Sequence, residues 1–122
     1  MSRILVVEDE ADIADNLVAL LTAKGHLATS AGDGTEALER AQKDLPDLIL
    51  LDVMLPRMSG FDVCKFLRAH PRTAKVKILM VTGLGRGSDV ETAFEAGADD
   101  YLVKPFDSAR LFKKIEKLLP PQ

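Results

Sequence analysis

The feature that most constrains the fold of this chain is an uninterrupted aliphatic run, Leu48 to Leu51, that leads directly into the carboxylate of Asp52. A short apolar run without alternating polar residues is typical of a strand buried on both faces, as in a parallel sheet covered by helices. Asp52 is then expected at the carboxyl end of the strand, the edge where open α/β folds bind their ligands. Taken alone, Asp52 is equally well explained as a residue that ends a strand or caps a helix.

Further apolar segments alternate with helical patterns along the chain. We expect five strands, at residues 4–7, 26–30, 48–51, 76–81 and 101–103. Apolar residues recur at helical spacing after each strand, which predicts five amphipathic helices. Their buried faces would be formed by Ile13, Leu17, Leu20 and Leu21, by Ala37, Leu38 and Ala41, by Phe61, Cys64 and Leu67, by Val90, Ala93 and Phe94, and by Leu111, Phe112, Ile115, Leu118 and Leu119. This alternation predicts a single α/β domain, residues 1–122, with a parallel sheet and right-handed crossovers.

Several predicted helices carry end signals. Gly25 follows the first helix as a residue that tolerates left-handed backbone. Ser88 and Glu91 have the spacing of a capping box at the start of the fourth helix, and Asp107 is placed to cap the fifth. The prolines at 120–121 are expected to end that last helix.

The composition excludes several classes of protein. The 122-residue chain is 47% apolar, enough for a packed core, and its net charge of −3 disfavours a nucleic-acid backbone as the main partner. Cys64 is the single cysteine, which excludes an intramolecular disulfide and a cysteine-rich zinc site, and its apolar surroundings predict a buried, unreactive thiol. The apolar segment 4–7 is too short for a signal peptide or a membrane span, so we expect a soluble cytoplasmic protein.

Polar residues follow four of the predicted strands. Glu8 and Asp9 end the first strand, Asp52 the third, Thr82 the fourth and Lys104 the fifth. Because the carboxyl ends of parallel strands meet at one edge of a sheet, we expect these side chains to converge on a small site. Each of them alone is typical of a solvated residue at a strand end, and it is their joint occurrence that favours a site.

Three carboxylates packed together repel each other unless a cation compensates their charge. A hard divalent ion, Mg²⁺, takes one or two carboxylate ligands and keeps several waters. We therefore expect Asp9 and Asp52 as direct ligands. Glu8 would contact the ion through water or orient its partner, and the backbone carbonyl of Met54 would supply a further oxygen. The helix dipole accounts for the neighbouring Glu10, since an acidic residue is favoured in a first helical turn.

An aspartate beside Mg²⁺, faced by a lysine and a hydroxyl group, is suited to accept a phosphoryl group. The Asp52 carboxylate is a competent nucleophile that can form an aspartyl-phosphate. Lys104 and the metal would share the charge on the transferring group, and the Thr82 hydroxyl would donate to a phosphoryl oxygen.

In chain order, the motif set is Glu8-Asp9, Asp52 with Pro56 and Gly60 after it, Thr82, and Lys104-Pro105. This ordered set resembles the receiver domains of bacterial two-component response regulators. The resemblance implies a CheY-like, flavodoxin-like fold, in which a doubly wound sheet of five parallel strands has the order 2-1-3-4-5. It implies that Asp52 receives phosphate from a sensor histidine kinase or a histidine phosphotransfer protein, with Mg²⁺ as cofactor. It also implies a cis peptide bond before Pro105, which would help to aim Lys104.

The resemblance further implies a phosphorylation-dependent switch. Thr82 would move toward the phosphoryl group and Tyr101 would rotate inward, which remodels the face formed by the fourth helix, the fifth strand and the fifth helix. A downstream effector protein or domain would bind this face, and a phosphorylated copy of the same domain is a further candidate partner. The chain would be a signalling module and not an enzyme, with no chemistry beyond its own phosphorylation and dephosphorylation.

The glycines after the fourth strand depart from the family pattern and suggest other functions. Receiver domains most often have alanine after the threonine, whereas Gly83 here begins a loop that also contains Gly85 and Gly87 and leaves the phosphoryl site more open. A dinucleotide-binding enzyme would need the spacing G-x-G-x-x-G after the first strand, which is absent here.

Other α/β proteins remain as alternatives. A flavin-binding protein is disfavoured because the acidic first loop would repel a phosphate. An aspartate-nucleophile phosphatase would carry its nucleophile after the first strand, where this chain has Glu8 and Asp9. The more serious alternative is an interaction module that keeps the receiver fold and acts without phosphorylation.

Overall fold

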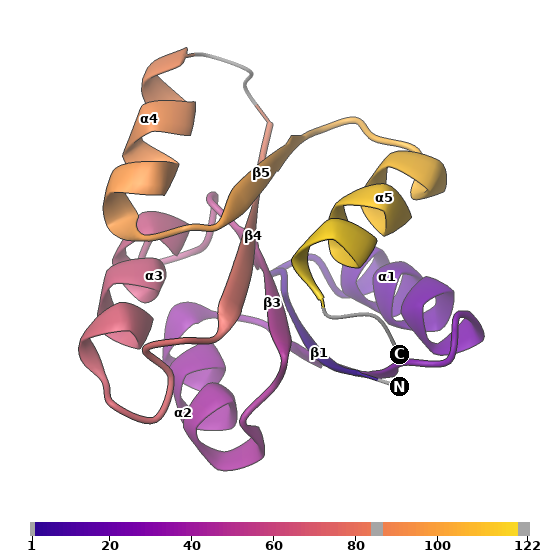
Figure 1. Cartoon of the computed structure of the whole chain (residues 1–122), viewed down its shortest axis with the longest axis horizontal. Helices are drawn as coiled ribbons and strands as arrows, with labels where there is room; N and C mark the ends of the chain where they lie inside the picture. The colour runs from indigo at the N-terminus through magenta and orange to yellow at the C-terminus, as the bar shows by residue number, and fades with distance from the viewer. Residues whose placement is uncertain (1, 84–86, 120–122) are drawn as a thin grey trace.

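The computed structural model of the chain describes residues 2–83 and 87–119, and within these ranges it contains one five-stranded parallel sheet (Figure 1). The strands are β1 (Arg3–Val7), β2 (Leu27–Ala31), β3 (Leu48–Asp52), β4 (Lys77–Thr82) and β5 (Asp100–Val103). Their order across the sheet is β2-β1-β3-β4-β5, so β3 lies at the centre and β5 at an edge. The predicted α/β class and the strand order 2-1-3-4-5 are therefore confirmed.

Helices cover both faces of the sheet. They are α1 (Ala11–Ala23), α2 (Gly34–Asp44), α3 (Gly60–Ala69), α4 (Gly87–Ala96) and α5 (Ser108–Leu118). Figure 1 shows α2, α3 and α4 on one face and α1 and α5 on the other. Of the helices described, none combines the length and the apolar composition that crossing a membrane requires.

The alternation of side chains along each strand divides the core into two layers. Leu48 and Leu50 of β3 pack on the α1/α5 side, whereas Ile49 and Leu51 pack on the α2/α3/α4 side. All four side chains are at most 1% exposed, as the uninterrupted aliphatic run predicted. Burial of each contributes about 1.5–3 kcal/mol, which fixes β3 as the rigid centre of the fold.

The predicted buried face of the first helix is partly wrong. Leu21 is fully buried, but Ile13 and Leu20 are 37% and 40% exposed, and Ala14 is buried in their place. The side of α1 that faces the sheet carries Ala14 and Leu21, which are two turns apart. The small side chain of Ala14 lets the helix lie close to the sheet. Helical spacing predicted the helix itself, but the rotation of the helix about its axis depends on its partners.

The other predicted faces agree better with the structure. Leu111, Ile115 and Leu119 of the last face are buried, and Cys64 in α3 is completely so. Phe94 of α4 is an exception because it is 46% exposed, and its ring contacts that of Tyr101. The prolines at 120–121 lie outside the described residues.

Helix ends are stabilised by side-chain caps, of which one was predicted. Asp107 accepts a hydrogen bond from the Arg110 N–H at 2.8 Å, which confirms it as the N-cap of α5. Gly25 has a φ of +92° directly after α1, as its role at a helix end requires. Helix α4 begins at Gly87, so Ser88 lies within it, and the side chain that the capping box needs lies outside the described residues.

Arg68 ties α3 to the turns before β4 and β5. Its guanidinium donates to the carbonyls of Gly97, at 2.8 Å, and Val76, and forms an ion pair of 2.8 Å with Asp99. The same Asp99 oxygen accepts the Ile78 N–H at 2.8 Å. The side chain of Arg68 is only 21% exposed, so its contacts are partly shielded from water.

We predict that Arg68→Ala lowers the free energy of unfolding by about 2–3 kcal/mol, because it removes the donor of the part-buried Gly97 and Val76 carbonyls and the cation that pairs with Asp99. Urea denaturation followed by circular dichroism measures the change. Lys65→Ala, which truncates an exposed side chain of the same helix, is the control and should stay within about 0.5 kcal/mol of the wild type. Equal effects of the two substitutions would contradict the role of Arg68.

Candidate functional site

Asp52 is the last residue of β3, and it is only 4% exposed. It follows Leu48 and Leu50 in the alternation of the strand and therefore lies toward the α1/α5 side. Each carboxylate oxygen has a donor: the Met54 N–H binds Oδ1 at 3.0 Å, and the Lys104 ammonium binds Oδ2 at 2.9 Å. The carboxylate is thus held in a fixed orientation at the carboxyl edge of the sheet.

Glu8 approaches the same point from the end of β1 and is 5% exposed. The Glu10 N–H donates to its Oε2 at 3.2 Å, and the Lys104 ammonium lies 3.5 Å from its Oε1. Burial raises the pKa of the Glu8 carboxyl, the Glu10 N–H counteracts this, and the charge of Asp52 raises the pKa further. A second cation near this carboxylate would favour its ionised form.

Lys104 connects the carboxylates of β1 and β3 from the end of β5. Burial alone would lower the pKa of its ammonium, but the hydrogen bond and charge of Asp52, together with those of Glu8, raise the pKa above its ordinary value. The Lys104 N–H donates to the Thr82 carbonyl at 2.8 Å, and the peptide bond to Pro105 is cis, as the resemblance implied.

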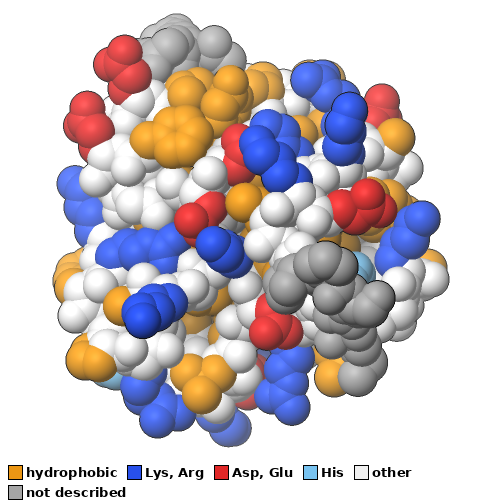
Figure 2. Space-filling model, in the orientation of Figure 1, with side chains coloured by type: hydrophobic (Ala, Val, Ile, Leu, Met, Phe, Trp, Pro, Cys, Tyr) orange, Lys and Arg blue, Asp and Glu red, His pale blue; other side chains and the backbone are white. Residues whose placement is uncertain are grey.

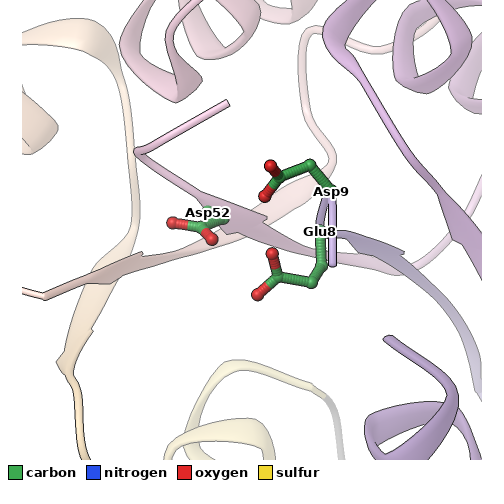
Figure 3. Close-up of side chains that lie close together, drawn as sticks. All are labelled: Glu8, Asp9 and Asp52. Carbon is green, nitrogen blue, oxygen red and sulfur yellow. The ribbon is translucent and has the colours of Figure 1, made fainter. Parts of the chain in front are cut away.

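The carboxylates of Glu8, Asp9 and Asp52 form a cluster whose ligand oxygens lie within 4.8 Å of one another (Figure 3). Asp9 is exposed, whereas its two neighbours are buried. Three carboxylates against the one ammonium of Lys104 leave an excess of negative charge, and these hard oxygen donors fit Mg²⁺. The structure brings the predicted metal ligands together, while their ligand roles, and that of the Met54 carbonyl, remain predictions.

Thr82 lies on β4, the strand beside β3, and Tyr101 lies on β5, the edge strand beyond β4. Thr82 ends β4, is 5% exposed, and follows Val81, the register partner of Asp52. Tyr101 is half-buried in β5 and makes an edge-to-face contact with Phe94 at 5.9 Å between ring centroids. The structure therefore places Thr82 at the same sheet edge as Asp52 and Tyr101 on the edge strand next to β4, and the switch roles of both residues remain predictions.

A cavity of about 510 Å³ opens beside the carboxylates on the α1/α5 side. It is lined by Val6, Val7, Glu8, Ile13, Leu17, Leu50, Asp52, Val81, Gly83, Lys104, Pro105 and Phe106. The sequence did not predict this cavity beside Asp52. Ile13 was expected in the core, and only its partial exposure shows that it lines an opening.

Gly60, part of the motif set, has a structural reason to be glycine. Its N–H donates to the Val53 carbonyl at 2.9 Å, which folds the loop after β3 back onto the strand end. A Cβ at this position would overlap the Asp52 carbonyl oxygen and lie 2.8 Å from the Val53 Cα. Any larger residue would therefore push against the backbone that carries Asp52.

Asp100, directly before Tyr101, is a buried carboxylate that the sequence interpretation missed. It is 5% exposed and accepts from the Tyr101 N–H at 2.8 Å and from the Lys114 ammonium at 3.0 and 3.1 Å. Burial alone would raise the pKa of Asp100, but the Tyr101 N–H, Lys114 and Lys117 together lower it. The sequence did contain a sign of this contact. Lys114 and Lys117 are three residues apart on α5, so they lie on the same side of that helix and can reach one carboxylate.

Comparison with known proteins agrees with the geometry of the site. The family model of the response regulator receiver domain matches residues 4–116. The DNA-binding dual master transcriptional regulator RpaA of Synechocystis is 42% identical over 119 residues, which cover 98% of this chain and 49% of RpaA. The chain thus spans about half the length of such curated relatives.

Two solved structures are similar over nearly the whole chain. The chemotaxis protein CheY4 of Vibrio cholerae has a TM-score of 0.93 and 34% identity, with 98% of this chain and 99% of that chain covered. The receiver domain of the sensor histidine kinase PA1611 of Pseudomonas aeruginosa has a TM-score of 0.88 and 32% identity, with 96% of each chain covered. That second structure holds a magnesium ion in its active-site cleft.

We predict that the same substitution has effects of different size at two glycines near the site. Gly60→Ala should lower the free energy of unfolding by about 2–3 kcal/mol, because backbone atoms must move. Gly83→Ala should change it by less than about 1 kcal/mol, since a Cβ there meets no described atom within 4 Å. Urea denaturation of both variants measures the difference, and comparable losses would show that the overlap at Gly60 is relieved without cost.

Asp100 predicts a specific dependence of stability on pH. Its folded-state pKa is lowered, so its contribution is present above about pH 4 and is lost as the pH falls through the folded-state pKa. Asp100→Asn should lower the free energy of unfolding by about 1–3 kcal/mol at neutral pH, with a smaller difference at low pH. Urea denaturation at both pH values measures this, and a difference that does not change with pH would contradict it.

Proposed function

The chain belongs to the response regulator receiver domain family, and from this membership we propose that Asp52 accepts a phosphoryl group from the phosphohistidine of a sensor histidine kinase or a histidine phosphotransfer protein. One observation carries the proposal: the Asp52 carboxylate is buried at a strand end, 2.9 Å from an ammonium and clustered with two further carboxylates. A carboxylate with only a structural role would need no such cluster, because a single cation satisfies it.

In the proposed reaction, an Asp52 oxygen attacks phosphorus and the P–N bond to the donor histidine breaks. The electron pair of that bond stays on the imidazole nitrogen, and because the other ring nitrogen of the phosphohistidine carries a proton, the donor leaves as a neutral histidine. When bound by Glu8, Asp9 and Asp52, with the Met54 carbonyl, Mg²⁺ would neutralise charge on the phosphoryl oxygens.

The protein's own groups would orient and stabilise the transfer. The Met54 N–H holds Oδ1 and the Lys104 ammonium holds Oδ2, so the nucleophile needs no large reorientation. Lys104 would then shift from the carboxylate to a phosphoryl oxygen, where its charge counts most in the transition state. The cavity beside Asp52 would give the donor side chain a route to the nucleophile.

The proposed output is a change of the surface formed by α4, β5 and α5. Thr82 would donate its hydroxyl to the new phosphoryl group, and Tyr101 would move inward from its half-exposed position. An effector protein or domain, or a second phosphorylated copy, would bind the altered surface. The domain would act as a cytoplasmic switch whose only chemistry is its own phosphorylation and dephosphorylation, and binding to nucleic acid would fall to other parts of a longer regulator.

We predict that the protein gains one phosphoryl group when incubated with Mg²⁺ and a small phosphodonor, and that Asp52→Asn abolishes the gain. Intact-mass spectrometry measures it. Asp62→Asn, which changes an exposed carboxylate of α3, is the matched control and should be labelled like the wild type.

Removal of Mg²⁺, or Asp9→Asn, should slow the labelling at least about tenfold, because charge on the phosphoryl oxygens is then uncompensated. Labelling that persists in Asp52→Asn would refute the assignment of the nucleophile. A wild-type protein that binds no Mg²⁺ and takes up no phosphate would instead support an interaction module that acts without phosphorylation.

A further inference from the structure

The ring of Tyr101 is contacted by two elements on either side of β5. Phe94 of α4 meets it edge to face, with an interplanar angle of 89°. The Lys114 ammonium of α5 lies 5.2 Å from its centroid, within range of a cation–π interaction. The ring is therefore held between an aromatic edge and a positive charge.

The Lys114 ammonium is itself fixed by a second contact. It binds both carboxylate oxygens of Asp100, at 3.0 and 3.1 Å, and Asp100 is 5% exposed. The Tyr101 N–H donates to the same carboxylate at 2.8 Å. Each of Lys114, Asp100 and Tyr101 therefore contacts the other two. Tyr101 takes part through its ring, which faces Lys114, and through its backbone N–H, which binds Asp100.

The position of β5 at the sheet edge makes this arrangement geometrically feasible. Successive side chains of a strand point to opposite faces, so Asp100 lies toward α5 and Tyr101 toward α4. In a central strand, a neighbouring strand would separate the two faces. At the edge, the lysine can pass around the strand and contact a carboxylate on one side and a ring on the other.

We propose that Lys114 is a positioning residue that holds the Tyr101 ring against Phe94 in the unphosphorylated protein, so that inward movement of the ring first requires its release from this ammonium. The inference rests on the proposed switch function and extends it to a residue outside the phosphoryl site. Because Lys114 is anchored on Asp100, the ammonium does not follow the ring when the ring moves. The contact therefore stabilises the resting position of the ring and not the inward position. A contact shifts the equilibrium between two states only if it differs between them.

Lys117 offers a matched comparison on the same helix. It is 71% exposed and lies 3.5 Å from a single oxygen of Asp100, whereas Lys114 is 31% exposed and binds both oxygens. Among the described contacts, the cation over the Tyr101 ring is that of Lys114. Loss of Lys117 removes a positive charge near Asp100 and leaves the contact with the ring.

The chain is well suited to a direct test, because Tyr101 is its single tyrosine and it has no tryptophan. Tyrosine fluorescence therefore reports this one ring, and its quenching by acrylamide reports the exposure of the ring to solvent. The proteins compared are the wild type, Lys114→Met, Lys114→Arg and Lys117→Met, each without phosphodonor and after incubation with Mg²⁺ and a small phosphodonor. Intact-mass spectrometry on the same samples measures the extent of phosphorylation.

In the unphosphorylated protein we expect Lys114→Met to lower the quenching constant of Tyr101 by about a factor of two, because the ring is freed to leave the solvent-facing position. It should also speed phosphorylation about three- to tenfold, since the resting state loses a contact that the active state lacks. Lys114→Arg, which keeps a cation over the ring, should restore both values, and Lys117→Met should match the wild type.

Unchanged or increased quenching in Lys114→Met, or equal effects of Lys117→Met, would overturn the inference. If Lys114→Met fails to fold by circular dichroism, Lys114→Gln, which keeps a donor for Asp100, replaces it. The two proposals can fail separately. A wild type that takes up no phosphate refutes the proposed function, while a wild type that is phosphorylated but shows no effect at Lys114 refutes only the positioning role.

Discussion

The carboxyl edge of the sheet depends on the ammonium of Lys104. It lies 2.9 Å from the Asp52 carboxylate and 3.5 Å from that of Glu8, and these two carboxylates are the buried ends of separate strands. Each buried carboxylate without a partner would cost several kcal/mol, so β1 and β3 can end in acidic residues only because β5 delivers a cation between them. The single ammonium does not balance the whole cluster, and the remaining negative charge is compatible with a divalent ion at this edge.

Side chains alternate between the two faces of the sheet along each strand. This alternation places the carboxylate site on one face and the Tyr101 ring of the proposed output surface on the other. Leu102 belongs to the α1/α5 core and Lys104 extends the same side, whereas Tyr101 packs on the side of α4. Figure 2 shows hydrophobic side chains exposed together over the α4 region of the molecule, next to charged groups of both signs. Strand β5 has only four residues, yet it contributes a buried carboxylate, a half-buried ring and, just after its end, the ammonium of the site. A small displacement of this strand therefore reaches both layers.

The sequence predicted what depends on local pattern and failed where distant partners decide. The aliphatic run of β3 and the polar residues after four strands were enough to predict a parallel sheet and the gathering of Asp9, Asp52 and Lys104, whereas the order of the strands came from the resemblance to receiver domains. Helical spacing did not predict that Ile13 would be exposed, because the rotation of a helix on a sheet is set by packing against residues elsewhere in the chain. Arg68 was missed because a charged residue in a helix is typical of a solvated face, and its partner Asp99 is 31 positions away.

Cys64 shows a different consequence of the close packing of α3. Its thiol is completely buried, and burial raises the pKa of the thiol to about 11. An oxidant or alkylating agent therefore meets two barriers, since the sulfur is inaccessible and the reactive thiolate is scarce at neutral pH. Both barriers disappear when α3 separates from the sheet. Covalent modification of Cys64 would consequently occur only while the protein is locally or globally unfolded. The fraction of modified molecules would therefore report how often the fold opens.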